Sequence, residues 1–347
     1  MSDSILIAGP CAAESEEQLL ATAGQLAVNL ELSGQKLDFF RAGVWKPRSQ
    51  PKEFKGAGKK AMGWLSKVQT MYGFRVCVEV AKPEHIDACE KAGIKAVWIG
   101  SRTVVNPFVV QELADSIRGR GFTVMVKNPI IPDIKLWIGS IERFMNAGVS
   151  NILAIHRGFA QQNENVFRYS PIWEIPIELK VNFPDIPLLC DPSHIAGDKK
   201  YLRQLSQIAL DFGFNGLMIE SHYKPQEALS DAKQQITPEE LATLLNSLTF
   251  KSSITSPVEY DLRKQRTLIT HIDDQISQLF AKRMSIVDII GKIKSENNLP
   301  LVQPQQFNKV VKTYIENGLR DENYTEFIQK FLELLHQSSI QRQKKYD

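Results

Sequence analysis

Short apolar runs alternate with helix-like segments over the first 250 residues, and this alternation constrains the fold more than any other sequence feature. Eight runs have the length and composition of strands buried on both faces. They are ILIAG (5–9), LDFFRAGV (37–44), FRVCVEV (74–80), AVWIG (96–100), FTVMVK (122–127), NILAIH (151–156), PLLCD (187–191) and GLMIES (216–221). Segments of helical period lie between them at 16–32, 83–92, 108–118, 134–147, 199–212 and 238–248.

This pattern indicates an α/β protein whose parallel strands are covered by helices. Eight strand–helix units in about 250 residues fit the size of a (β/α)8 TIM barrel. A doubly wound open sheet is the competing architecture, but the regularity of the eight units favours closure. We therefore predict a barrel domain over residues 1–250.

The character of the chain changes at the stretch TFKSSITSP (249–257), which predicts a linker over 251–258. No strand-like run follows, and helices are expected over 259–297, 305–318 and 323–344. A helix of 39 residues would be about 58 Å long, too long for two shorter helices of the same chain to cover. We expect residues 259–347 to form an all-α, three-helix domain that makes an intertwined dimer.

Composition and charge exclude several classes of protein. The chain is 43% hydrophobic and 23% charged, with a net charge of +3, which is ordinary globular composition and gives no argument for nucleic-acid binding. We find neither a secretory signal nor an apolar run of about 18 residues, so no membrane span is expected. The four cysteines form no CxxC pair, which predicts a cytoplasmic protein.

Metal-binding side chains follow three of the predicted strands. Active sites of barrels form at the carboxyl ends of the strands. The residues found there include Cys11, His194, Glu220 and Asp231. One thiolate, one imidazole and two carboxylates suit a borderline divalent ion such as Mn, Fe, Co or Zn. Each residue alone is more often structural, but four of them at one mouth predict a metal site.

Basic side chains share the same mouth. They are Arg41, Lys46, Arg48, Arg102, Lys127 and Arg157. Such a cluster repels itself unless an anion binds there, and Arg pairs with phosphate and carboxylate through two parallel hydrogen bonds. The predicted ligand therefore carries several negative charges, as a phosphate with a carboxylate would. The stretch KGAGKK (55–60) lacks the spacing and the Ser or Thr of a nucleotide loop and indicates a helix start.

Five motifs give this barrel a family resemblance. GPC (9–11), KPRS (46–49), DPSH (191–194), IESH (219–222) and SDA (230–232) resemble those of the 3-deoxy-D-arabino-heptulosonate 7-phosphate (DAHP) synthases. The resemblance covers residues 1–250 and is to the barrel-only core of the smaller type I subtype. It implies condensation of phosphoenolpyruvate with erythrose 4-phosphate, the first committed step of the shikimate pathway.

The resemblance also implies roles for individual residues. Cys11, His194, Glu220 and Asp231 would hold one divalent ion, with Mn favoured and Fe, Co, Zn or Cd as alternatives. Phosphoenolpyruvate would contact Arg102, Lys127 and Arg157, with Arg41 and Lys46 beside them. Erythrose 4-phosphate would contact Lys46, Pro47, Arg48 and Ser49, where the family usually has Thr in place of Ser49. Catalytic roles are expected for Lys46, Lys127 and Glu79, the last positioning a water.

The alternative for the barrel is a 3-deoxy-D-manno-octulosonate 8-phosphate synthase, a related barrel that uses arabinose 5-phosphate. That family has Lys-Ala-Asn-Arg where this chain has Lys46-Pro47-Arg48-Ser49. The motif therefore favours the four-carbon sugar.

The tail resembles the all-helical chorismate mutases, which rearrange chorismate to prephenate. The residues that carry this resemblance are Arg266, Asp273, Arg283, Lys294 and SIQRQ (339–343). Arg283 and Lys294 share a helix face about 16 Å apart, whereas Arg266 lies roughly 42 Å from Lys294 and would enter the site of a dimer partner. The resemblance implies that Arg266 and Arg283 bind carboxylates. It also implies that Lys294 and Gln343 address the ether oxygen, with Ser339 nearby.

One part of the tail departs from the mutase pattern. Gln303, Gln306 and Phe307 stand where the family commonly has Asp, Arg and Glu or Gln, which leaves mutase activity open but not the fold. A sensor or coiled dimerisation module without catalysis is the alternative. Because prephenate lies downstream of the barrel product, the fusion predicts that prephenate inhibits the barrel through the helical domain. The expected assembly is a homodimer or higher homo-oligomer.

Overall fold

The computed structural model describes residues 4–46, 52, 54–160, 166–249, 257–300, 313 and 322–346. In the two long terminal helices, the described side chains are those from residue 265 onward and those of 327, 328 and 330 onward. The chain divides into two compact units, Met1–Leu268 and Ile269–Asp347. The predicted domain limits, 1–250, 251–258 and 259–347, stay predictions.

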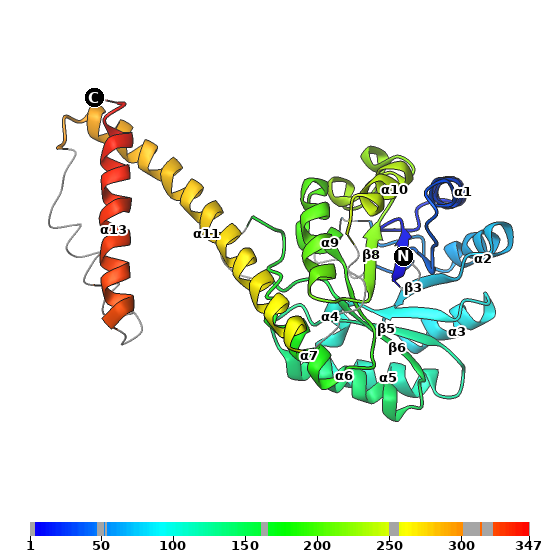
Figure 1. The fold of residues 1–347 in the computed structure, drawn as a ribbon. Coiled ribbons are helices and arrows are strands. Elements are labelled where there is room, and N and C mark those ends of the chain that lie inside the picture. Colours follow the sequence, from blue (N-terminus) through cyan, green and yellow to red (C-terminus); the bar gives the residue numbers. More distant parts are fainter. Residues whose placement is uncertain are drawn as a thin grey trace. The chain divides into compact units, whose positions relative to one another are not determined.

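The first unit is a closed barrel of eight parallel strands, which confirms the predicted fold (Figure 1). The strands are β1 (Ile5–Gly9), β2 (Phe39–Arg41), β3 (Val76–Val80), β4 (Ala96–Ile99), β5 (Thr123–Lys127), β6 (Asn151–His156), β7 (Leu188–Cys190) and β8 (Gly216–Glu220). Strand β1 pairs with β8 from Ile5↔Gly216 to Gly9↔Glu220, and this pairing closes the barrel. Closure places the carboxyl ends of all eight strands around one mouth.

Alternation along the strands builds two apolar layers. One set of side chains fills the barrel interior: Ile7, Phe39, Cys77, Ala96, Trp98, Met125, Leu153, Ile155, Leu189 and Met218. The alternate residues, such as Leu6 and Ala8 of β1, belong to the larger core between the strands and the helices. Both faces of each strand are therefore buried, which explains why the strands read as continuous apolar runs.

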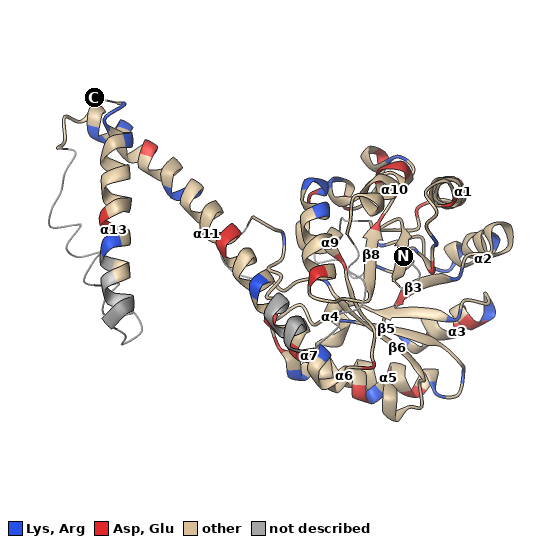
Figure 2. Cartoon of the chain, viewed as in Figure 1, with Lys and Arg blue, Asp and Glu red and all other residues tan. Residues whose placement is uncertain are grey.

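Helices surround the strands (Figure 1). They are α1 (Glu16–Leu32), α2 (Lys60–Tyr72), α3 (Pro83–Lys91), α4 (Ser101–Val104), α5 (Pro107–Ile117), α6 (Ile134–Asn146), α7 (Glu174–Asn182), α8 (Pro192–Ala196), α9 (Leu202–Asp211) and α10 (Pro238–Asn246). Polar caps fix several of their starts, as at Thr237, which forms a reciprocal capping box with Glu240. Figure 2 shows acidic and basic residues interspersed along these helices, in keeping with the small net charge.

A short helix carries one of the predicted metal ligands. The Asp191 side chain caps α8 by accepting a hydrogen bond from the His194 backbone N–H at 3.1 Å. Pro192 then occupies a first-turn position, where its missing N–H costs nothing. The sequence DPSH thus starts a helix directly after β7 and places His194 in its first turn.

The second unit contains the greater part of α11 (Pro257–Glu296) together with α13 (Glu322–Gln343). Met284 and Val287 of α11 and Ile328 and Leu332 of α13 are buried. Arg342 donates two hydrogen bonds to Asp288, at 2.7 and 2.8 Å, which fixes the two helices against each other. Among the described residues, no helix combines the length and the apolar character needed to cross a membrane.

Candidate active site

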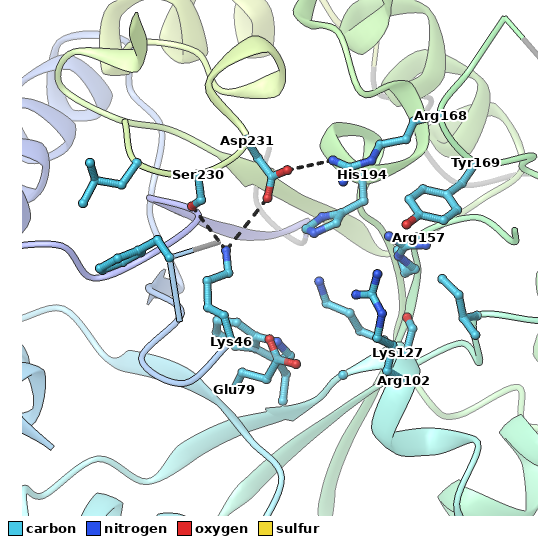
Figure 3. A pocket seen from close by; sticks show the side chains of 16 residues that line it. Lys46, Glu79, Arg102, Lys127, Arg157, Arg168, Tyr169, His194, Ser230 and Asp231 are labelled. Atoms are coloured by element: carbon cyan, nitrogen blue, oxygen red, sulfur yellow. Dashed lines mark hydrogen bonds and ion pairs between the residues drawn. The ribbon is translucent and has the colours of Figure 1, made fainter. Parts of the chain in front are cut away.

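A cavity of about 390 Å³ opens at the carboxyl ends of the barrel strands (Figure 3). Seven of the predicted site residues line it: Lys46, Glu79, Arg102, Lys127, Arg157, His194 and Asp231. Arg168 and Tyr169, which no sequence pattern singled out, also line it. Among the charged side chains of the lining, basic groups outnumber the acidic groups of Glu79 and Asp231.

The four predicted metal ligands lie in two neighbouring pairs. Cys11 Sγ is 3.0 Å from Asp231 Oδ2, and His194 Nε2 is 3.7 Å from Glu220 Oε1. Within the described part of the chain, no three His, Cys, Asp or Glu side chains are arranged around a single ion position. Burial and the charge of Glu220 raise the pKa of Cys11 to about 12, although Lys46 opposes this rise. The thiol therefore keeps its proton at neutral pH unless a stronger cation binds beside it.

The chemistry of these donors fits a divalent metal. Asp191 Oδ2 lies 2.8 Å from His194 Nδ1, which leaves Nε2 directed toward Glu220. A carboxylate behind the imidazole is the usual support of a metal-ligating histidine. Asp231 has a φ of 53°, a left-handed conformation that is uncommon outside glycine and concentrated at functional sites. The residues present therefore suit a borderline divalent ion.

Asp191 is the central anion of the site, and sequence reasoning noted it only as part of a motif. It is fully buried, 2.8 Å from Lys127 Nζ and 3.9 Å from an Arg41 nitrogen. Burial alone would raise the pKa of Asp191, but His194, Lys127 and Arg41 hold it well below its usual range. The carboxylate is therefore ionised, and it neutralises buried cations while orienting His194.

The predicted cations differ in their surroundings. Arg41 is 1% exposed, lies 2.9 Å from Glu220 and does not line the cavity. Lys127 lines the cavity but is bound to Asp191. In contrast, no carboxylate of the described residues lies within ion-pair distance of Arg102 or Arg157. These two guanidinium groups are therefore available for an anionic ligand, and the contact of Arg41 with substrate stays a prediction.

Lys46 is the first residue of the motif predicted to bind the sugar phosphate, and it also contacts the predicted metal ligands. Its Nζ donates to Cys11 Sγ and, at 3.0 Å, to the Cys11 carbonyl oxygen. The same Nζ lies 4.0 Å from Asp231 Oδ2 (Figure 3). The preceding Trp45 stacks on His85 with ring centroids 3.9 Å apart, which anchors the start of the loop. Pro47, Arg48 and Ser49 lie outside the described residues. The predicted contact of this motif with the sugar phosphate stays a prediction.

The helical unit brings together three of its predicted site residues. Arg283 of α11 donates to Ser339 Oγ of α13 at 2.7 Å. Gln343 is 6% exposed, and its Oε1 has no hydrogen-bond partner among the described residues. Gly291 of α11 lets α13 pack closely at Gln343, because a Cβ at position 291 would lie 3.3 Å from the Gln343 Cα. Lys294 and Arg266 lie on α11, while Gln303, Gln306 and Phe307 fall outside the described residues.

Comparison with known proteins decides the family. Residues 2–255 match the model of the DAHP synthetase I family. The chain belongs to this family. Residues 265–344 match a second model, that of chorismate mutase type II, so a second family module follows the DAHP synthetase barrel.

The curated relatives of this DAHP synthetase chain include heptonate aldolases and octonate aldolases. It is 32% identical over 232 residues to a phospho-2-dehydro-3-deoxyheptonate aldolase of Thermotoga maritima, covering 67% of this chain and 64% of the relative. It is 25% identical over 270 residues to a 2-dehydro-3-deoxyphosphooctonate aldolase of Wolinella succinogenes, covering 72% of this chain and all of the relative. A crystal structure of the Thermotoga enzyme, also called DAHP synthase, is similar with a TM-score of 0.62 and 27% identity, over 70% of this chain and 67% of that one.

Two supporting residues of the DAHP synthetase barrel escaped sequence analysis. Arg168 donates to Asp231 Oδ1 at 2.8 Å and to Gln234 Oε1 at 2.9 Å. Gln234 in turn donates to Glu220 Oε2 at 2.6 Å. Both carboxylates of the donor set are thus held by one short network. The only signal for Arg168 was its place in the long irregular connection after β6, since such loops carry function in barrels.

Proposed function

We propose that the barrel condenses phosphoenolpyruvate with erythrose 4-phosphate to give DAHP and phosphate, and that the helical unit rearranges chorismate to prephenate. The observation that carries the first activity is the cavity itself. Its lining includes two guanidinium groups, Arg102 and Arg157, that have no carboxylate of the described residues within ion-pair distance, and it also includes the predicted metal ligands His194 and Asp231. A ligand with a phosphate and a carboxylate matches the first pair, and an aldehyde needs polarisation at the second.

The proposed reaction makes one carbon–carbon bond and releases phosphate. C3 of phosphoenolpyruvate attacks the aldehyde carbon of the sugar, and the aldehyde oxygen takes a proton. C2 becomes cationic and accepts water, which loses one proton and so balances the proton taken by the aldehyde oxygen. The bond from C2 to the phosphate oxygen then breaks as the new C2 hydroxyl becomes a carbonyl, and the hydroxyl proton leaves with the phosphate. Arg102, Lys127 and Arg157 stabilise the phosphate and carboxylate charges throughout. Glu79, half-buried at the cavity wall, positions the water.

A divalent ion belongs to this proposal. Bound by Cys11, His194, Glu220 and Asp231, it supplies Lewis-acid polarisation of the aldehyde oxygen. Manganese is the preferred ion, with Fe, Co, Zn and Cd as alternatives, because these donors discriminate weakly among such metals. Lys46, which contacts Cys11 and lies near Asp231, holds the sugar substrate beside the ion.

The mutase proposal rests on preorganised cations in the helical unit. The rearrangement of chorismate needs no nucleophile, only binding of two carboxylates and stabilisation of charge on the breaking ether oxygen. Arg283, held by Ser339, binds a carboxylate, and Lys294 with Gln343 addresses the ether oxygen. Arg266 completes the site from a second copy of the chain.

The assembly is a homodimer or a higher homo-oligomer formed through the helical unit. Several large apolar side chains of α11 are exposed in the single chain, including Ile269 at 58%, Ile276 at 52% and Leu279 at 64%. Apolar stripes of this size mark protein interfaces. The four cysteines are unpaired, which favours a reducing, cytoplasmic setting for this assembly.

The test uses full-length protein loaded with Mn²⁺. Phosphoenolpyruvate consumption is followed with erythrose 4-phosphate and, separately, with arabinose 5-phosphate, and chorismate loss is followed alone. Consumption with the four-carbon sugar, together with chorismate loss, is the expected result. Consumption only with the five-carbon sugar would replace the assignment by that of an octulosonate 8-phosphate synthase. An absence of chorismate loss would reduce the helical unit to a sensor or dimerisation module.

Feedback control by prephenate is the last part of the proposal. The mutase product lies downstream of the barrel product, so inhibition through the helical unit would regulate flux into the pathway. We expect prephenate to lower DAHP synthesis by the full-length protein. If prephenate leaves this rate unchanged, and deletion of the tail also changes nothing, the regulatory role is refuted.

A further inference from the structure

We propose that Tyr169 is a positioning residue for phosphoenolpyruvate. Its ring stacks on the Arg157 guanidinium and orients it, and this contact leaves the charge of Arg157 available to the substrate. This inference rests on the proposed condensation activity. It assigns a role to a residue in the connection after β6. The sequence analysis did not select this residue, because it considered side chains directly behind the predicted strands.

The first support is the contact itself. The Arg157 Cζ lies 3.6 Å from the centroid of the Tyr169 ring, close enough for a strong cation–π interaction. Arg157 is 4% exposed, so little water competes with the ring. Figure 3 shows both side chains on the same wall of the cavity, with the ring beside the guanidinium group.

The second support is the contrast between two buried arginines of one site. Arg41 is oriented by carboxylates, at 2.9 Å from Glu220 and 3.9 Å from Asp191, and these anions neutralise it. Arg157 has no carboxylate of the described residues within ion-pair distance. An aromatic face orients a guanidinium group through its quadrupole and carries no net charge. The Tyr169 ring, together with the hydrogen bond between the Tyr169 hydroxyl and the guanidinium group, therefore fixes Arg157 while its charge remains available for an anion.

The third support is the backbone that holds the ring in place. Phe159 and Ser170 exchange two backbone hydrogen bonds, at 2.8 and 2.9 Å, which sets Tyr169 opposite the segment that follows Arg157. Gly158 has a φ of +77°, and a Cβ there would lie 2.8 Å from the Tyr169 Cβ. Glycine at 158 thus permits the close approach that brings the ring over Arg157.

The experiment compares Tyr169→Leu, which removes the ring, with Tyr169→Phe, which keeps it. Tyr201→Leu is the matched control, because Tyr201 packs edge-on against Phe167 of the same loop but does not line the cavity. For Tyr169→Leu we expect KM for phosphoenolpyruvate to rise about 10- to 30-fold, the equivalent of about 1.4–2 kcal/mol. The kcat and the KM for the aldose phosphate should stay within about 3-fold, as for an interaction made equally in the ground and transition states.

Calorimetric titration of Mn²⁺-loaded protein with phosphoenolpyruvate alone should show the same loss of affinity for Tyr169→Leu and no loss for Tyr201→Leu. Tyr169→Phe, which keeps the ring but loses the hydroxyl hydrogen bond to Arg157, should show a smaller loss than Tyr169→Leu. An unchanged affinity in Tyr169→Leu would overturn the proposal. An equal loss in Tyr201→Leu would assign the effect to the loop in general, and an equal loss in Tyr169→Phe would assign it to the hydroxyl. Wild-type protein that binds phosphoenolpyruvate without turning it over would refute the condensation activity alone, whereas wild-type protein that does not bind it would overturn both.

Discussion

Substitution of Asp191 by Asn tests whether one carboxylate holds the barrel site together. The side chain keeps its size, and Asn caps a helix as well as Asp does, so α8 should still start at Pro192. What is lost is the negative charge that lies 2.8 Å from Lys127 Nζ and 2.8 Å from His194 Nδ1. Glu220 would then be the remaining buried carboxylate for Arg41 and the neighbouring cations.

The magnitude follows from burial. Lys127 is 4% exposed and Asp191 is fully buried, so solvent cannot replace the lost partner. Removing one member of a buried ion pair costs about 3–5 kcal/mol. With a urea dependence of about 2–3 kcal/mol per M for a domain of this size, the unfolding midpoint should fall by about 1–2.5 M.

Tryptophan fluorescence is a suitable assay in the full-length chain. All five tryptophans, at 45, 64, 98, 137 and 173, lie in the barrel, so their signal reports its unfolding and not that of the helical unit. The double variant Asp191→Asn with Lys127→Met is the control, because it removes the uncompensated cation and should be more stable than Asp191→Asn alone. A loss below about 1 kcal/mol, as for an exposed ion pair, would refute the central role of Asp191.

Three further predictions concern separate parts of the chain. Gly291→Ala should lower chorismate turnover and leave phosphoenolpyruvate consumption unchanged. A methyl group at position 291 would meet Tyr346 and the Gln343 backbone, and overpacking of this kind costs about 1–3 kcal/mol. Equal losses of both activities would contradict this prediction. Burial and the charge of Arg157 lower the pKa of His156 to about 3, so its contribution to stability is present above an unfolded-state pKa of about 6.5 and is lost as the pH falls toward 3. His156→Phe should therefore flatten the fall in barrel stability between about pH 6.5 and 4.5 by up to about 1.4 kcal/mol per pH unit, and urea titrations with the wild-type slope would speak against this account. Chelation of divalent ions should stop phosphoenolpyruvate consumption but not chorismate loss, and Mn²⁺ should restore the former; metal-independent condensation would rule out the proposed metal role.

The barrel could be predicted because its signals are local. Each strand is buried on both faces and therefore reads as an apolar run, and parallel strands bring their carboxyl ends to one mouth. Residues within or close behind a strand, such as Glu79 and His194, could thus be assigned to one site from chain order alone. The edges were less predictable: β2 covers Phe39–Arg41 and β7 covers Leu188–Cys190, shorter than the runs at 37–44 and 187–191.

Other parts of the site depend on contacts that chain order does not encode. Arg168 and Tyr169 lie outside helices and strands, so neither the two-residue alternation of a strand nor the 3.6-residue repeat of a helix indicates where their side chains point. The helix α7 was also not predicted, because it contains Pro176 and its apolar residues do not gather on one face of the helix. The tail was easier, since the helices expected at 259–297 and 323–344 correspond to Pro257–Glu296 and Glu322–Gln343.

The distribution of buried charge explains why basic residues that look alike in the sequence have different electrostatic surroundings in the barrel. Asp191 and Glu220 neutralise the cations nearest the barrel interior, Arg41 and Lys127, and this balance makes their burial tolerable. Among the described residues, no carboxylate lies within ion-pair distance of Arg102 or Arg157, so the rim of the cavity keeps an excess of positive charge. That excess costs stability in the free protein, and a ligand bearing phosphate and carboxylate relieves it. If the proposed function holds, selectivity for a doubly anionic substrate would follow from the lack of carboxylates beside these two guanidinium groups. The sequence alone does not reveal this lack, because it depends on which cations the fold pairs with Asp191 and Glu220.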